Sequence, residues 1–241
     1  MVLPSNNKDL FVILTNHKYA KWATSFVNVI RNVENMSKIA CLTVGNIQPE
    51  DILSLQNACT MVLPSTTNEN WPSPHWYKLR MFVEPVFRQF ERVRYADVDH
   101  AVKHGGIDWD AWVGTPSEPV GILYGGCNVN GGRMREFKEI TNDIKHQFPA
   151  SEYDLKGECL TTRVMVMETK YLPPVREMKK RVTKLQQEYP PSVFKFHEQG
   201  FIQMLFWNNT HYLKKNPSGL KHLYHMKCQV DKHGQCKPEQ R

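Results

Sequence analysis

The sequence predicts an α/β fold, with a mostly parallel central sheet and helices on both of its faces. Short apolar runs typical of buried strands alternate with amphipathic segments of helical length over the first hundred residues. This alternation is the pattern of strand–helix–strand units. The chain has 241 residues, of which 41% are hydrophobic, and this suffices for a sizeable core. We therefore expect one domain over residues 1–241.

The alternation begins near the N-terminus. Residues 9–14 form an apolar run flanked by polar residues, which predicts a buried strand. Trp22, Phe26, Val29 and Ile30 follow at helical spacing. Further along the chain we predict strands at 38–44, 60–63 and 92–96, and helices at 48–57 and 78–90. A proline inside the last of these segments should kink or divide the helix.

The second half of the sequence is less regular. A glycine-rich segment at 123–133 precedes a predicted helix at 134–144. A strand at 163–168 follows, and then a helix at 175–188 that lies between two Pro-Pro pairs. The last dozen residues are polar, so we expect a flexible tail from about residue 229.

The charge of the chain argues against a nucleic-acid-binding protein. The net charge of +7 is diffuse, whereas such proteins usually gather it into a stripe interleaved with aromatic residues. One local excess of positive charge lies at 179–184. It is typical of a solvated helix face, and the alternative is attraction to a phosphorylated ligand or an anionic surface.

Cysteine spacing and hydropathy indicate the compartment. The six cysteines are scattered without a C-x-x-C pair, which favours a reducing compartment over a zinc ribbon or a disulfide framework. The apolar runs are too short to span a bilayer, and the first residues lack the pattern of a secretory signal. We expect a cytoplasmic protein without a transmembrane segment, and its oligomeric state is not predicted.

Asp97 and Asp99 form a D-x-D motif directly after the predicted strand at 92–96. In open α/β sheets, ligands bind beyond the carboxyl ends of the strands. Two carboxylates one residue apart can converge on one hard cation, and Mg²⁺ or Mn²⁺ with a nucleotide diphosphate suits such ligands. The motif alone is more typical of a solvated turn, and the strand before it makes a metal site about equally favoured.

Two other segments carry candidate chemistry. Residues 124–133 contain four glycines, which let a backbone approach a ligand closely but also fit a pair of tight turns. Residues 196–200 place His197, Glu198 and Gln199 side by side. Glu198 suits a base or a negative charge that faces an oxocarbenium ion, and the segment equally fits an ordinary helix start.

A late pair of residues completes the set. His225 and Lys227 lie two residues apart near the C-terminus. An imidazole and an ammonium group are a candidate metal ligand and a candidate phosphate contact. Alone, the pair more often belongs to an ordinary surface segment.

The order of these segments resembles the GT-A class of glycosyltransferases. Residues 95–99, YADVD, look like the D-V-D metal segment of glycosyltransferase family 6, the histo-blood-group ABO and α-1,3-galactosyltransferase group. Residues 124–141 look like that family's Y-x-G-G-x-x-G-G turn and the helix after it. Residues 196–206, FHEQGFIQMLF, look like its W-H-D-E-S-H-L-N segment. The likeness spans roughly residues 90–210.

The sequence also departs from family 6. That family's catalytic Glu falls on Gln199, and the Asp before it falls on Glu198. A Gln at this place is similar to family 8, the glycogenin-like retaining enzymes with a D-Q motif, and the late His225 and Lys227 also look like family 8. The resemblance therefore implies that Glu198 and Gln199 are catalytic, and it leaves open which of them faces the anomeric carbon.

The resemblance implies a single Rossmann-like GT-A domain with a nucleotide-binding half at 1–99 and an acceptor-binding half at 100–241. It implies a UDP-sugar donor, Mn²⁺ or Mg²⁺, a glycan or glycoconjugate acceptor and retention of configuration. The implied metal ligands are Asp97, Asp99 and His225. The implied nucleotide contacts are Thr15, Asn16, Tyr19, Lys78, Arg80, Asp97 and Lys227. The implied sugar and acceptor contacts are Tyr124, Gly125, Gly126 and His197. Trp109 is, with Trp112, a candidate platform on which an acceptor would stack, although packing in a core or a lid is the more common role of such tryptophans.

Two alternatives stay open. A nucleotide-sugar-binding protein without transfer activity is one, because the carboxylate expected for catalysis is displaced. A basic nucleic-acid-binding domain is the other, and its binding would fall steeply with salt and ignore UDP and Mn²⁺.

Overall fold

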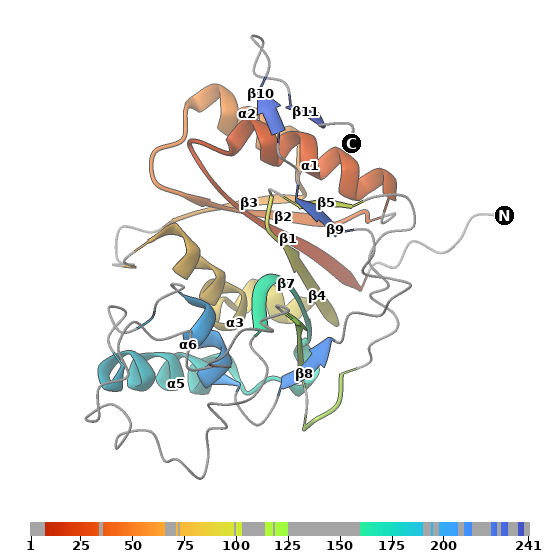
Figure 1. Ribbon diagram of the computed structural model, residues 1–241. Coiled ribbons are helices and arrows are strands. Elements are labelled where there is room, and N and C mark those ends of the chain that lie inside the picture. The colour runs from red at the N-terminus through yellow and green to blue at the C-terminus, as the bar shows by residue number, and fades with distance from the viewer. Residues whose placement is uncertain are drawn as a thin grey trace, which may run out of the picture.

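The computed structural model describes residues 8–33, 36–65, 71, 73–98, 100–102, 114–117, 119–124, 160–189, 194, 198–206, 210–213, 223–225, 228–230 and 236–238. Its centre is a seven-stranded sheet (Figure 1). In sheet order the strands are β3 (Met61–Pro64), β2 (Ile39–Val44), β1 (Asp9–Asn16), β4 (Arg92–Ala96), β7 (Leu160–Glu168), β6 (Val120–Tyr124) and β8 (Thr210–Leu213). All run the same way except β7, which is antiparallel to both of its neighbours. The predicted mostly parallel sheet is confirmed.

Helices cover both faces of the sheet. One face carries α1 (Ala20–Val33) and α2 (Pro49–Ala58). The other carries η1 (Pro74–Leu79), α3 (Arg80–Val83), η2 (Pro85–Gln89), α5 (Val175–Glu188) and α6 (Glu198–Leu205), while η5 (Thr169–Tyr171) follows β7 directly. Within the described residues, no helix combines the length and the apolar character needed to cross a membrane.

Strand β1 shows why two layers of helices form. Its side chains alternate between the faces of the sheet, as in any strand. Leu10 and Val12 pack into the core under η1, α5 and α6. Phe11 and Ile13 pack into the core under α1, where Phe26 meets Phe11 edge to face. A strand with an unbroken apolar run, here residues 10–14, buries both faces, which is typical of a central parallel strand.

The helix predicted at 78–90 is divided at Pro85, as the proline inside it indicated. The structure divides it into the end of η1, then α3, then η2. Pro74 and Pro85 each stand at the first position of a new short helix. Proline has no N–H to donate and disfavours a helical conformation of the residue before it, so each proline starts a new helical segment.

The order of the strands creates a switch point beside β1. The chain passes from β1 outward to β2 and β3, and then returns to form β4 on the other side of β1. The connection that follows β1 therefore leads to one side of the sheet, and the connection that follows β4 leads to the other side. In open α/β sheets, a crevice forms at this place and binds ligands.

Two small antiparallel ribbons complete the described part of the molecule. Strand β5 (His100–Val102) pairs with β9 (Leu223–His225), and β10 (Cys228–Val230) pairs with β11 (Cys236–Pro238). The second ribbon lies in the tail that was predicted to be flexible. The predicted helix at 134–144 lies outside the described residues.

Candidate active site

The candidate site begins at the carboxyl ends of β1 and β4. Asp97 directly follows β4, and its backbone N–H donates to the carbonyl oxygen of Arg163 on β7 at 2.9 Å. This bond extends the β4–β7 pairing by one residue, so the first carboxylate of the D-x-D motif is held at the edge of the sheet. Thr15 and Asn16 end the neighbouring strand β1. The two ends flank the switch point.

Lys78 connects the D-x-D motif to α6. The Lys78 Nζ atom lies 2.9 Å from Asp97 Oδ1 and 2.9 Å from Glu198 Oε1. The side chains of Lys78 and Glu198 are 3% and 4% exposed, whereas that of Asp97 is 23% exposed. One buried ammonium group therefore holds two carboxylates from distant parts of the sequence, and Asp97 is the partner that reaches solvent.

Tyr95 braces the same carboxylate. The Tyr95 hydroxyl donates to Asp97 Oδ1 at 2.6 Å, and its ring centroid lies 5.2 Å from Lys78 Nζ. A cation near an aromatic face is attracted by the negative π surface. Oδ1 of Asp97 is thus committed to two protein groups. The geometry fixes the direction in which Asp97 faces.

Thr162 on β7 holds the first turn of α6. Its hydroxyl donates to Glu198 Oε1 at 2.7 Å, and its backbone N–H donates to Gln199 Oε1 at 3.3 Å. Lys78 Nζ also lies 3.4 Å from the Thr162 carbonyl oxygen. The two residues that the sequence offered as catalytic are therefore anchored to the sheet by one threonine. Glu198 is buried and Gln199 is partly exposed.

Lys78 is charged in spite of its burial. Desolvation alone would lower the pKa of Lys78, but attraction to Asp97 and Glu198, with hydrogen bonds to both, outweighs desolvation and raises this pKa above its ordinary value of 10.5. Two carboxylates against one ammonium group leave one net negative charge at the edge of the sheet. This charge favours a cation nearby.

The β5–β9 ribbon pairs His225, a predicted metal ligand, with the residue that follows the D-x-D motif in the sequence. In this antiparallel register His225 lies directly opposite His100, the residue after Asp99. Residues directly opposite in such a pair have Cα atoms about 4.5–5.5 Å apart. Asp99 and the side chain of His225 lie outside the described part of the structure.

The turn after β1 presents two aromatic rings. Asn16 Oδ1 accepts a hydrogen bond from the Lys18 backbone N–H at 3.0 Å, which closes the turn that starts α1. Tyr19, 40% exposed, packs edge to face on Trp22 with ring centroids 5.5 Å apart. Thr15, in contrast, is buried.

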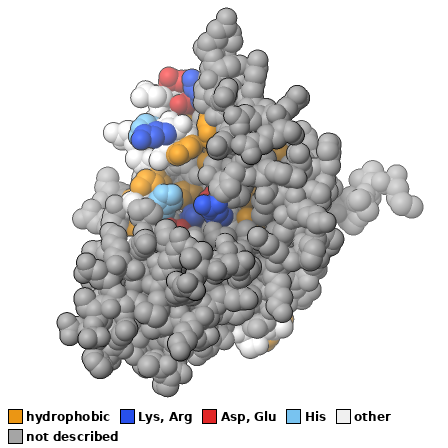
Figure 2. All heavy atoms as spheres, viewed as in Figure 1, with side chains coloured by type: hydrophobic (Ala, Val, Ile, Leu, Met, Phe, Trp, Pro, Cys, Tyr) orange, Lys and Arg blue, Asp and Glu red, His pale blue; other side chains and the backbone are white. Residues whose placement is uncertain are grey.

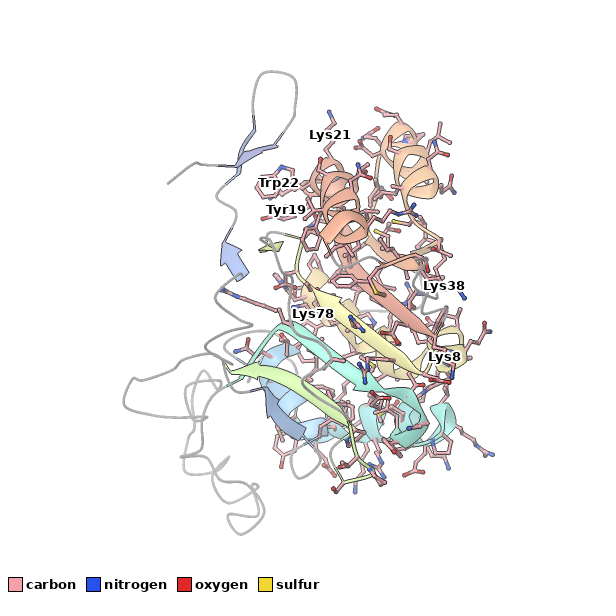
Figure 3. All side chains as sticks on the ribbon, turned by 90° about the vertical axis from the view of Figure 1, so that its right-hand side faces the viewer. Lys8, Tyr19, Lys21, Trp22, Lys38 and Lys78 are labelled. Atoms are coloured by element: carbon pink, nitrogen blue, oxygen red, sulfur yellow. The ribbon has the colours of Figure 1, made fainter. Side chains whose placement is uncertain are left out.

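The figures locate this turn relative to the buried lysine. Figure 3 shows Tyr19, Trp22 and Lys78 on one side of the molecule, and Lys8 and Lys38, which precede β1 and β2, on the other. On the face in Figure 2, the largest area of described surface lies at the upper left, where basic, acidic, His and hydrophobic groups adjoin.

Arg80 was predicted to contact the nucleotide, and its described contacts are with protein groups. Its guanidinium donates to the carbonyl oxygens of Leu63 and Pro64 at 3.3 and 2.8 Å, and it pairs with Glu84 at 2.9 Å. These bonds fix the end of β3. A nucleotide contact of Arg80 stays a prediction.

Several predicted site residues lie outside the described part of the structure. They are Asp99, Trp109, Gly125, Gly126, His197 and Lys227. Tyr124 and His225 are described as strand residues, without their side chains. Among the side chains that are described, no group of three or more His, Cys, Asp or Glu forms a metal-binding cluster.

Sequence reasoning missed Tyr95 and Thr162. Tyr95 stands two residues before Asp97, at a spacing that places both on one side of an extended segment, so its role was detectable. Thr162 gave a weaker signal, since a threonine is common in any strand. The role of Thr162 depends on the packing of α6 against β7, which the local sequence does not reveal.

Comparison with known proteins supports the fold. No family model matches the sequence, and no curated protein gives a significant sequence match. The bifunctional glycosyltransferase WbbM superposes with a TM-score of 0.60 at 12% identity, over 88% of this chain and 40% of that one. An active-site mutant of LgtC, in which a glutamine is replaced by glutamate, gives 0.55 at 12% identity over 84% of this chain and 72% of LgtC.

A third match comes from a bacterial enzyme. The glycosyltransferase GlyE of Streptococcus pneumoniae gives a TM-score of 0.54 at 13% identity, over 86% of this chain and 45% of that one. The chain thus spans less than half the length of WbbM and of GlyE. Together these likenesses show that the chain has the GT-A fold expected from its motifs.

Proposed function

We propose that the protein is a metal-dependent glycosyltransferase that moves a sugar from a UDP-sugar to a glycan or glycoconjugate, with retention of configuration. The contact of Lys78 with both Asp97 and Glu198 carries this proposal. It joins the D-x-D motif to the H-E-Q segment at the carboxyl edge, where α/β enzymes bind nucleotides. The GT-A fold supports the same assignment.

The residues at this edge fit a hard divalent cation. Asp97, Asp99 and His225 would hold Mn²⁺ or Mg²⁺ through two carboxylates and one imidazole, a donor set that suits these ions. The β5–β9 register and the net negative charge around Lys78 support the set. When bound, the cation stabilises negative charge on the leaving diphosphate. Lys227 would contact the same diphosphate.

The turn after β1 is suited to the nucleotide. The exposed ring of Tyr19 offers a stacking surface for a base, and Thr15 and Asn16 lie at the same edge. Lys78 takes a different part from the direct nucleotide contact first expected. Because its ammonium group is buried between two carboxylates, it holds Asp97 and Glu198 in place.

Gln199 is the better candidate to face the anomeric carbon. Glu198 is buried, and its carboxylate is held by Lys78 and Thr162. Gln199 is partly exposed on the same turn, and its side-chain oxygen accepts a hydrogen bond from the Thr162 N–H. The dipole of its amide carbonyl would stabilise positive charge on the reacting sugar.

The remaining site residues stay predictions. Tyr124, Gly125, Gly126, His197 and Trp109 would contact the sugar and the acceptor. The division into a nucleotide-binding half at 1–99 and an acceptor-binding half at 100–241 follows the same resemblance.

A thermal-shift screen of nucleotide-sugars with and without Mn²⁺ tests the proposal. A ligand at 100 times its dissociation constant should stabilise the fold by about 2.7 kcal/mol. For a protein of this size, that stabilisation raises the melting temperature by roughly 5–11 °C. We expect a UDP-sugar to give this shift with Mn²⁺ and little without it.

Two results of the screen would count against the proposal. Absence of a shift with every nucleotide-sugar would contradict nucleotide-sugar binding. A shift without UDP release in the presence of acceptors would favour a binding protein that has no transfer activity.

A further inference from the structure

Helix α5 carries a basic groove that the proposed transfer reaction does not use. The helix buries Met178 and Val182 against the core shared with α3 and α6. Its opposite face lines an open groove of about 700 Å³. Figure 1 shows α5 far from β5 and β9, on the other side of the molecule. The polar lining residues that define the basic groove are Arg176, Lys179, Lys180, Thr183, Lys184 and Gln187.

The cations of the basic groove form a continuous row. Arg176, Lys180 and Lys184 succeed one another every four residues, over about 12 Å of helix, and Lys179 lies beside them. The Lys184 Nζ atom lies 3.7 Å from Glu188 Oε1. An exposed ion pair of this kind contributes little to stability. In the part of the chain that the structure describes, Arg176, Lys179 and Lys180 have no acidic partner. The row therefore attracts a partner with several negative charges.

The lining of the basic groove discriminates between kinds of polyanion. Helices that bind membranes insert an apolar face, but the apolar face of α5 is packed into the core. Proteins that bind single-stranded nucleic acid stack bases on aromatic rings, and the described lining contains none. Thr183 and Gln187 instead place a hydroxyl and an amide beside the cations. Such groups hydrogen-bond to sugar hydroxyls as well as to anions.

We propose that the basic groove binds an anionic glycan chain, whose sugars carry carboxylate, sulfate or phosphate groups. That the polyanion is a glycan rests on the proposed function, because a glycosyltransferase acts on carbohydrate acceptors. The location of α5 agrees with this assignment. It packs against α6, whose first turn carries Gln199, so the helix that bears the basic groove belongs to the same helical layer as that residue.

Binding of polygalacturonate oligomers tests the proposal without donor or metal. Lys179→Gln combined with Lys180→Gln removes two charges from the basic groove. Arg181→Glu changes the charge by the same amount on the same helix, but Arg181 lies outside the groove and pairs with Glu177. We expect the double variant to bind about tenfold more weakly or worse, and its salt dependence to lose a slope of roughly two. The Arg181→Glu control should bind like the wild type.

The remaining outcomes are equally decisive. Equal weakening in both variants, or in neither, would contradict the basic groove. Tighter binding to a single-stranded DNA oligomer of matched charge, or to vesicles of phosphatidylserine and phosphatidylcholine, would contradict the glycan assignment. Failure of the proposed function would appear separately, as absence of stabilisation of the wild type by UDP-sugars. Melting curves of the double variant and of Arg181→Glu would show that both fold.

Discussion

Lys78 is the residue on which the site depends. Its ammonium group neutralises two carboxylates that would otherwise be held close together in a largely water-free place. Burial of an unpaired charge costs far more free energy than burial of an ion pair. Loss of one partner should therefore destabilise the folded state strongly. The same residue links the geometry of the metal motif to that of α6. Its contribution to stability and its contribution to function are therefore coupled.

Replacement of Lys78 by Met should be costly. We expect Lys78→Met to lower the free energy of unfolding by about 3–5 kcal/mol, because two carboxylates lose their shared cation. Urea denaturation at neutral pH measures this loss. Lys170→Met removes an exposed lysine and serves as the matched control. Similar costs for the two variants would contradict the role given to Lys78.

The difference in unfolding free energy between the wild type and Lys78→Met depends on pH. The folded state raises the pKa of Lys78, so its stabilising contribution is complete below the ordinary pKa of 10.5. It is lost as the pH rises toward the folded-state pKa. The difference in unfolding free energy between wild type and Lys78→Met should therefore be constant from neutral pH to about 10 and shrink at higher pH. A difference that disappears below pH 10 would contradict this.

Glu198 and Gln199 should differ in their effects. We expect Gln199→Ala to lower kcat by about 10²–10³ while the fold stays stable, because a group that faces developing charge is lost. Glu198→Gln should instead lower stability, since it breaks the pairing with Lys78. Turnover at saturating donor and Mn²⁺, together with melting curves, separates the two. Near-wild-type turnover of Gln199→Ala would remove it from the mechanism.

Local patterns in the sequence selected Asp97 and Glu198 as candidates, and the family resemblance selected Lys78. The structure brings these three candidate residues together. Their contact was not predictable, because it depends on how α6 packs against β7 and η1. Thr162 was missed for the same reason. Local patterns indicate the residue types that chemistry needs, and tertiary packing decides which of them meet.

At the scale of elements, length decided which predictions succeeded. Strands β1 and β2 carry continuous apolar runs and helix α5 carries a long periodic pattern, and their predicted bounds agree closely with the structure. The strands of both ribbons have three residues each, too few for any period to appear. Their positions depend on pairing with partners far along the chain, such as β5 with β9.

Strand β9 offers a test of the metal proposal by truncation. A chain that ends at His222 lacks β9, whereas a chain that ends at Lys227 keeps it and removes β10 and β11. The last strand of the main sheet, β8, ends before both cuts. We expect both chains to fold and the shorter chain alone to lose Mn²⁺-dependent UDP binding, as measured by calorimetry. Equal affinity in the two truncated chains would contradict a part for His225.

At the scale of the whole molecule, the fold follows from a pattern of apolar and polar positions rather than from particular residues. Alternating apolar strands and amphipathic helices sufficed to predict a sheet with helices on both faces. Structures at 12–13% identity share that architecture. Burial of apolar groups on both faces of β1 and its neighbours is a physical requirement that many sequences satisfy. The site is more demanding, since it needs particular charged groups at the switch point.

The two candidate binding surfaces have opposite charge. The group around Asp97 carries net negative charge and suits a cation with its diphosphate, whereas the basic groove on α5 suits an anionic chain. This separation explains how a chain with net charge +7 accommodates a metal site. It also means that the basic groove, which attracts a polyanion, lies away from the metal-binding edge.

Release of UDP from a panel of UDP-sugars tests the central claim most directly. The measurement compares the wild type with Mn²⁺, the wild type with EDTA, and Asp99→Asn with Mn²⁺, each with mixed glycan acceptors. We predict that the wild type with Mn²⁺ releases UDP from at least one donor. We predict that both EDTA and Asp99→Asn abolish the release, while Asp99→Asn keeps the wild-type melting temperature. Release that is unaffected by EDTA and by Asp99→Asn would contradict a metal-dependent transferase built on this motif.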